Sequence, residues 1–416
     1  MNKCLLKDIA KFNSSSFIIK GKEYINYLDT SSITENCINN IQKLFLGKDV
    51  IPSRAKRFVK KDTIIYSSVR PNLKHFGILE YPIENMVVST GFITLDVEDV
   101  TKYNPKYIYY NLSQQTNTDY LQNIAQTNVS SYPSINDTDL MGLKLSIVGD
   151  VTKQKCVADV LSALDDKIKL NNKINQELEK TAKDLYNYWF VQFDFPDGNK
   201  RPYKSSGGKM VYNEILKREV PEGWTVDNFN KYVTIGSGYP FNSNDYDKSG
   251  EWKIVTIKNV QDGYLDLSTI ENITKIPENA PRFVKLDIGD VLISLTGNVG
   301  RTCLVDADNL LLNQRVGKFL TNDTFLLFSY LFLSTKENKA RLEQISNGSS
   351  QQNLSPLQAV DFMFCVPRND ILNKFNKIIQ PIYDKLIFNK QESRRLTILR
   401  DFLLPMLMNG QVSVSD

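Results

Sequence analysis

The sequence carries the same order of motifs twice, and this duplication constrains the fold more than any other feature. Arg-Phe-Val-Lys at 57–60 recurs at 282–285, in each case shortly before an aspartate, Asp62 or Asp290, and an apolar run. Each copy is typical of a buried strand entered from a turn. Because the repeat spans about half of the chain, it predicts two copies of one domain rather than a solenoid of short units.

Length and composition agree with two domains. A chain of 416 residues exceeds what one hydrophobic core usually serves. The alternating apolar residues at 143–147 recur at 362–366, which indicates a strand in each half. We therefore predict an α+β fold with two tandem domains of mixed α/β structure and a β-rich core, at 1–150 and 223–371. Helical patterns are expected within them, at 107–120 and 325–345.

Each half ends in a long heptad pattern, which predicts long helices at 151–190 and 372–408. Apolar residues recur at steps of three and four, but both patterns turn polar at the same central layer. We expect the two helices to pair, and a buried polar layer to fix their register at some cost in stability. Two unrelated amphipathic helices packed on separate cores are the alternative. The register residues are Asn171, Asn175, Asn389 and Ser393.

The segment between the halves, 191–222, is punctuated by proline and glycine and is expected to be loop-rich, with at most a short helix. Its paired glycines lack the spacing of a phosphate-binding loop. Residues 409–416 form a short tail.

Composition excludes several classes of function. His75 is the single histidine, so sites with two imidazoles are excluded. Five cysteines without a C-x-x-C pair suggest neither a zinc site nor a disulfide framework, and fit a reducing cytoplasm. No apolar stretch is long enough for a signal peptide or a membrane span. The net charge of +4 permits a polyanionic partner without requiring one.

No motif of a catalytic or metal site stands out. A Walker A loop, a nucleophile elbow and a metal-ligand cluster are absent from the sequence. Asn-Pro-Lys-Tyr at 104–107 is similar to a methyltransferase tetrapeptide, but it opens a helical pattern and lacks an upstream glycine-rich loop. We therefore expect neither catalytic nor metal-binding residues in this chain.

At this point the motifs resemble those of a known family. Over essentially its full length the chain resembles the specificity subunit of type I restriction-modification systems. The resemblance rests on the order of five segments, at 67–78, 87–95, 195–224, 289–301 and 348–355.

The resemblance implies a DNA-binding subunit without catalytic activity. It implies two target-recognition domains separated by two long helices that pair as an antiparallel coiled coil, with the halves related by a pseudo-twofold axis. It further implies double-stranded DNA, two modification subunits docked on the helices and two restriction subunits as partners. S-adenosylmethionine, ATP and Mg²⁺ are expected on these partners and not on this chain.

The helices then have a physical purpose. About thirty helical residues span about 45 Å, comparable to about thirteen base pairs. Such a rod would hold two recognition domains at a set separation on one duplex. Because the halves differ in sequence between their shared motifs, we expect an asymmetric bipartite target.

Candidate DNA contacts follow from residue chemistry on the matched loops. Arginine suits guanine, asparagine suits adenine, and lysine suits phosphate. Polar runs at 126–132 and 349–353 lie at matched positions before the last strand of each half. The candidates are Lys56, Arg57, Arg70, Asn72, Lys74, His75 and Tyr132 in the first half, and Arg282, Lys285, Thr296, Asn298, Arg301, Ser350, Gln351 and Gln352 in the second.

Two hypotheses from other classes stay open at this stage. One is a coiled-coil scaffold whose β-rich domains bind protein or glycan, which a weak salt dependence of DNA binding would favour. The other is a self-sufficient enzyme, which methylation by the isolated chain would support.

Overall fold

The structure, a computed structural model, describes residues 2–16, 21–127, 132–346, 352–412 and 414. It divides into two compact units. The first unit is Met1–Leu170 with Arg394–Asp416, and the second is Asn171–Ser393. Both boundaries fall inside long helices, so each unit combines a β-rich part with a segment of each long helix.

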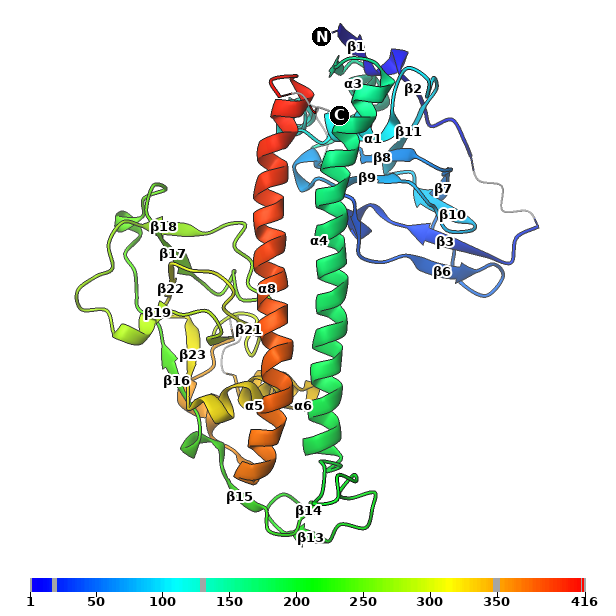
Figure 1. Ribbon diagram of the computed structural model, residues 1–416. Coiled ribbons are helices and arrows are strands. Elements are labelled where there is room, and N and C mark those ends of the chain that lie inside the picture. The colour runs from blue at the N-terminus through cyan, green and yellow to red at the C-terminus, as the bar shows by residue number, and fades with distance from the viewer. Residues whose placement is uncertain (1, 17–20, 128–131, 347–351, 413, 415–416) are drawn as a thin grey trace. The chain divides into compact units, whose positions relative to one another are not determined.

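In the described residues of the first unit, two four-stranded sheets have the orders β2-β11-β8-β9 and β6-β3-β10-β7 (Figure 1). β1 pairs antiparallel with β12, and β4 with β5. The strands are β1 Asn2–Leu5, β2 Ala10–Phe12, β3 Tyr24–Leu28, β4 Ile33–Thr34, β5 Cys37–Ile38, β6 Gln42–Phe45, β7 Ala55–Phe58, β8 Thr63–Ser67, β9 Phe76–Leu79, β10 Met86–Ser89, β11 Phe92–Val97 and β12 Lys144–Ile147. The helices are α1 Pro105–Leu112, α2 Gln115–Thr127, α3 Asp137–Met141, the first part of α4 Val151–Tyr186 and the last part of α8 Asn369–Met408.

The second unit has sheets of order β16-β23-β20-β21 and β18-β17-β22-β19 and a β15-β24 pair, again counted over its described residues. Its strands are β13 Met210–Asn213, β14 Arg218–Pro221, β15 Thr225–Asn228, β16 Thr234–Ser237, β17 Trp252–Val255, β18 Glu271–Ile273, β19 Lys285–Leu286, β20 Val291–Ser294, β21 Thr302–Leu304, β22 Leu310–Leu312, β23 Val316–Leu320 and β24 Met363–Val366. Its helices are α5 Asp323–Leu333, α6 Lys336–Ile345, α7 Pro356–Val360, the last part of α4 and the first part of α8.

The two units share one topology. Each strand of the first unit's two large sheets has a counterpart in the second, in the same order. The single parallel contact within these sheets also recurs, between β3 and β10 and between β17 and β22. The duplicated motifs of the sequence therefore correspond to a duplicated fold.

Strand register corrects the sequence alignment of the repeats. The pairing of β8 with β11, and of β20 with β23, makes Ser67 equivalent to Ser294. Counting back along β8 and β20, Asp62 corresponds to Gly289 and not to Asp290. Asp62 and Gly289 both have a left-handed backbone, with φ of 63° and 92°. The turn keeps its backbone conformation while the residue type changes from aspartate to glycine. For this reason the sequence alignment paired Asp62 with Asp290, which is the wrong residue.

The two Arg-Phe-Val-Lys motifs are displaced in a similar way. Val87 of β10 pairs with Phe58, and its equivalent Leu311 of β22 pairs with Lys285. Phe58 thus corresponds to Lys285 and not to Phe283. The basic residues of the two motifs do not occupy equivalent positions.

The predicted helical patterns at 107–120 and 325–345 do form helices, but neither segment is one continuous helix. Each is broken into two helices, α1 with α2 and α5 with α6. Asn117 and Asn338 donate side-chain hydrogen bonds to the carbonyls of Asn111 and Phe332, at 2.7 and 2.8 Å. These bonds satisfy backbone acceptors that a continuous helix would use, and so stabilise the break.

The segment 104–107 is the start of a helix. Asn104 caps α1 by accepting a hydrogen bond from the N–H of Tyr107, and Asn322 caps α5 through Phe325 in the same way, both at 3.0 Å. Such caps are preferred where a helix begins. Asn104 therefore has a structural function.

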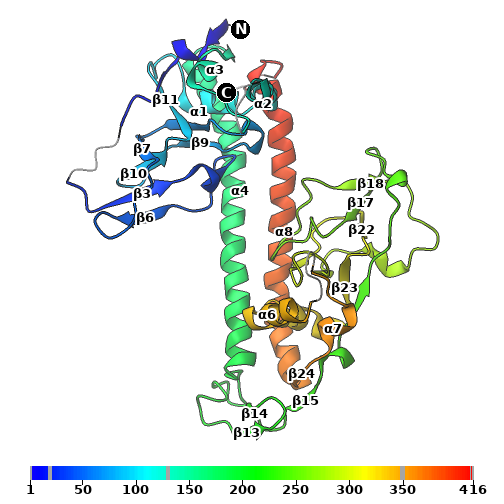
Figure 2. The ribbon, with the colours of Figure 1, turned by 180° about the vertical axis from the view of Figure 1, so that it is seen from behind.

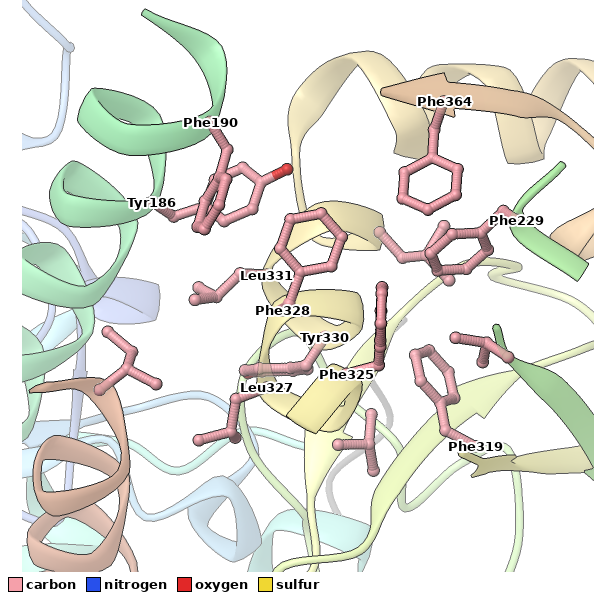
Figure 3. Close-up of a cluster of buried hydrophobic side chains, with 14 of the residues drawn as sticks. Tyr186, Phe190, Phe229, Phe319, Phe325, Leu327, Phe328, Tyr330, Leu331 and Phe364 are labelled. Carbon is pink, nitrogen blue, oxygen red and sulfur yellow. The ribbon is translucent and has the colours of Figure 1, made fainter. Parts of the chain in front are cut away.

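The core of the second unit is aromatic. Figure 3 shows Phe328 of α5 among Phe190, Tyr186 and Phe364. The ring of Phe328 lies 5.0 Å from that of Phe190, measured between centroids. Residues 187–191 continue α4 as a π-helical turn, so the end of α4 is anchored in this core.

The segment 191–222 contains more order than expected. β13 and β14 form an antiparallel hairpin, which the sequence reasoning missed. Phe193 and Phe195 are buried against Trp224, with ring centroids 5.7 and 5.1 Å away. The beginning of this connector therefore belongs to the core of the second unit.

Candidate nucleic-acid interface

In the first unit, the loop after β8 is tied to a segment far away in the sequence. Val69 bridges Ser134, and the N–H of Arg70 donates to the carbonyl of Pro133 at 2.9 Å. We call residues 68–75 with 132–135 the first bridged loop. The guanidinium of Arg70 lies 5.0 Å from the centre of the Tyr132 ring, a cation–π arrangement. Both side chains are exposed, so this pair presents a flat cationic surface.

The other predicted residues of this loop differ in how available they are. Lys74 makes an ion pair with Glu35 at 2.7 Å, and is thereby engaged within the chain. Nδ1 of His75 lies 2.6 Å from the carbonyl of Ile33, and the ring is half-buried. Asn72 has an exposed side chain. Arg70 and Asn72 are therefore the better candidates for an external ligand.

The second unit has an equivalent loop. Thr296 bridges Asn353, and the N–H of Gly297 donates to the carbonyl of Gln352 at 2.9 Å. We call residues 295–301 with 352–354 the second bridged loop. Thr296 is buried and its hydroxyl lies 2.9 Å from Oδ1 of Asn353, so its function is to hold the loop.

Three more residues complete this site. Asn298 and Arg301 were predicted from the sequence, and Arg315 was not. Asn298 is exposed, while Nη1 of Arg301 donates to Oε1 of Gln261 at 2.6 Å. Nη1 of Arg315 lies 3.4 Å from Oδ1 of Asn353, although Arg315 comes from the turn between β22 and β23. The sequence signal was a lone basic residue between two apolar strands, which is too common to single out.

Several predicted residues lie elsewhere. Lys56 and Arg57 are on β7, and Arg282 and Lys285 lie in or just before β19, which places them in the other sheet of each unit. Arg57 is half-buried; burial lowers its pKa, and Asp137 opposes that shift. Lys285 lies over a tryptophan ring. The structure does not bring these four to the bridged loops.

The second polar run, 349–353, lies only partly within the described residues. Ser350 and Gln351 lie outside the described residues. Gln352 is described and exposed, next to the bridge.

The predicted register residues contact one another. Nδ2 of Asn389 donates to Oδ1 of Asn175 at 3.0 Å. Nδ2 of Asn171 donates to Glu392 at 2.8 Å and lies 3.3 Å from Oγ of Ser393. The three asparagines are buried, so α4 and α8 share a polar layer within the second unit.

A second contact between these helices lies in the first unit and was not predicted. Nη1 of Arg400 donates to Asp165 at 2.9 Å, and Asp165 also accepts from the Tyr110 hydroxyl at 2.7 Å. Burial alone would lower the pKa of Arg400, but Asp165 and Asp401 raise it above the usual value. Burial and Asp165 raise the pKa of Tyr110. The cation is therefore held fully charged at the helix contact.

A cavity of about 600 Å³ adjoins this network. It lies beside α2 and the end of α8, which Figure 2 shows close together in the first unit. Its counterpart in the second unit, of about 640 Å³, lies between the end of α4, α5 and β24. The duplication thus extends to the hollows between the helices and the β-rich parts.

Neither a metal centre nor a membrane segment is found in the part of the chain that the structure describes. Within it no three His, Cys, Asp or Glu side chains gather as metal ligands. No helix among the same residues has the length and apolarity to cross a bilayer.

The fold and these loops define a class of protein with two copies of one α/β domain that present different exposed polar side chains at equivalent loops. A family model described as the type I restriction modification DNA specificity domain matches residues 1–180 and 221–396. The chain therefore belongs to the family of type I restriction-modification specificity subunits. It is a DNA sequence-specificity subunit, as the motifs predicted.

Individual relatives cover nearly the whole chain. The type I restriction enzyme HindI specificity subunit of Haemophilus influenzae is 25% identical over 98% of each chain. The MjaIX specificity subunit of Methanocaldococcus jannaschii is 24% identical over 99% of this chain and 93% of that one. Among solved structures, the type I S subunit from M. genitalium has a TM-score of 0.58 at 15% identity, covering 98% and 95% of the two chains. That likeness supports the mixed α/β fold.

Proposed function

We propose that this chain reads an asymmetric bipartite sequence in double-stranded DNA, one half-site with each unit. The observation that carries the proposal is that the two bridged loops have the same backbone connections but different side chains. Arg70 and Tyr132 belong to the first loop, whereas Asn298 belongs to the second and Arg315 lies beside it, against Asn353. The same loop with different donors in each unit supports two dissimilar half-sites.

The long helices serve, in this proposal, as an antiparallel coiled coil that sets the separation of the half-sites. Within the second unit, the Asn171–Ser393 and Asn175–Asn389 contacts support antiparallel pairing, because the residue number rises along α4 while it falls along α8. α4 has 36 residues and α8 has 40, long enough for several heptads.

The chain itself is proposed to be non-catalytic. Two modification subunits would dock on the helices, and two restriction subunits would complete the assembly on DNA. S-adenosylmethionine, ATP and Mg²⁺ would bind to these partners.

Methylome sequencing tests the proposal. The chain is expressed with its modification subunits in a methylation-free host, and methylated positions are mapped. The expected result is one interrupted motif with two different halves and a constant spacer. A single uninterrupted motif, or no methylation that depends on this chain, would contradict it.

Deleting one heptad from both helices tests the spacer. Seven residues at 1.5 Å each shorten the rod by about 10 Å. We expect a shorter spacer or loss of activity, and an unchanged spacer would disprove the separating function of the helices.

A further inference from the structure

Two arginines occupy reciprocal positions at the bridged loops: Arg70 lies within the first loop, and Arg315 lies beside the second. The N–H groups of Arg70 and Gly297 donate to equivalent carbonyls across the bridge, at 2.9 Å in both units, so these residues correspond. Similarly, the carbonyls of Gly91 and Arg315 accept from the equivalent N–H groups of residues 68 and 295. Each unit thus has one arginine and one glycine at the two positions, in opposite arrangement.

Arg70 is held in a backbone conformation that suits glycine. Its φ is 49°, and that of its counterpart Gly297 is 74°. A residue with a side chain loses folding free energy in this left-handed region. That loss indicates that the Arg70 side chain has a function that glycine could not supply.

Two other left-handed residues of the first unit have local explanations. Aspartate, as at Asp62, tolerates this region better than most residues. Lys74, with φ of 54°, corresponds to Gly300 and uses its side chain in the ion pair with Glu35. Within the described residues Arg70 makes no ion pair of this kind, and its guanidinium lies over the exposed Tyr132 ring.

Arg315 is positioned by side chains rather than by its backbone. Nη1 lies 3.5 Å from the hydroxyl of Thr296 and 3.4 Å from Oδ1 of Asn353. Within the described residues these are the hydrogen bonds of its guanidinium. The bridge residues therefore orient one edge of the group and leave the other N–H groups to an external acceptor.

We propose that Arg70 and Arg315 are specificity-determining residues, each recognising a guanine in its own half-site. This rests on the proposed function above. Arginine binds O6 and N7 of guanine with two parallel hydrogen bonds in the major groove. Because Arg70 follows β8 whereas Arg315 precedes β23, the counterpart of β11, the two guanidinium groups meet the duplex at different places in the two half-sites. The reciprocal exchange thereby makes the target asymmetric.

The variants Arg70→Gly and Arg315→Gly test this, because glycine already occupies each equivalent position in the other unit. Arg70→Gly relieves the left-handed strain, so it is expected to fold at least as well as the parent chain. Arg70→Lys and Arg315→Lys retain the charge but not the two parallel bonds. Lys48→Gln and Arg368→Gln are charge-matched controls away from the bridged loops; Lys48 is exposed, and Arg368 pairs with Asp370 on the surface.

The readout is the sequence preference of the assembled modification complex on a pool of randomised duplexes. Each glycine variant should lose about 5- to 150-fold discrimination for guanine at one position of one half-site, with the other half-site unchanged. Lysine variants should restore affinity but not this discrimination. The controls should match the parent chain.

Two outcomes would overturn the proposal. One is an unchanged preference in both glycine variants. The other is an equal loss on all sequences with a smaller salt dependence, which would assign the arginines to phosphates. Absence of a bipartite preference in the parent complex is different, since it would contradict the proposed function itself.

Discussion

Replacement of Phe328 by alanine should destabilise the second unit by about 3–5 kcal/mol. Phe328 is 2% exposed, and its ring lies within 5.0 Å of Phe190 and 5.7 Å of Tyr186, centroid to centroid. Truncation of a buried phenylalanine typically costs about 3–5 kcal/mol, because transfer and cavity terms add. Aromatic pairs contribute about 0.5–1.5 kcal/mol each beyond buried area, which favours the upper part of that range.

The chain contains a reporter for this unit. Its three tryptophans, Trp189, Trp224 and Trp252, all lie within Asn171–Ser393. Urea unfolding followed by tryptophan fluorescence therefore measures the second unit without a signal from the first. The ring of Phe190 lies 6.3 Å from Trp189 and 6.2 Å from Trp224, so the probe is coupled to the altered cluster.

Phe388→Ala is the matched control. This phenylalanine lies in the same unit but is 52% exposed, and its truncation should change stability by less than about 0.5 kcal/mol. Equal midpoints for the Phe328 and Phe388 variants would refute the assignment of Phe328 to a tightly packed core. So would a loss at Phe328 below about 1 kcal/mol.

Three further predictions concern the helix contacts and a buried tyrosine. Asp165→Ala should destabilise the first unit by about 3 kcal/mol, because it leaves Arg400 buried with weaker partners. The double variant Asp165→Leu with Arg400→Met should have nearly the stability of the parent chain by calorimetry. Equal losses of stability in the single and the double variant would argue against a charge effect. Leucine at both Asn175 and Asn389 should raise the thermal midpoint, while either single change lowers it; a raised midpoint in a single variant would contradict the value of this hydrogen bond. Burial raises the pKa of Tyr66 to about 12 from an ordinary value near 10. The stability that the neutral tyrosine contributes is therefore complete below pH 10 and is lost as the pH rises toward 12, at about 1.4 kcal/mol per pH unit. Tyr66→Phe should reduce this alkaline loss without a penalty at pH 7, which unfolding series at both ends of the range would check.

The duplication, the family and the recognition of DNA could be predicted from the sequence. These depend on signals that are local along the chain: alternating apolar residues, heptad spacing and the order of short motifs. The polar residues Asn171, Asn175 and Asn389 interrupt two heptad patterns at one level, and the structure brings their side chains together. Periodicity is a property of residues close together along the chain, so it can be recognised without knowledge of the fold.

The membership of the site was decided by the tertiary structure. Arg315 lies beside the second bridged loop because β23 pairs with β20. Lys56 on β7 and Arg282 just before β19 lie away from the bridged loops, because β7 and β19 belong to the other sheet of each unit. Arg400 stands in a heptad position, yet its partner Asp165 comes from the other long helix. Contacts of this kind depend on which distant strands and helices pair and in which register. A shift of one residue along a strand changes them all, and no spacing along the chain records that choice.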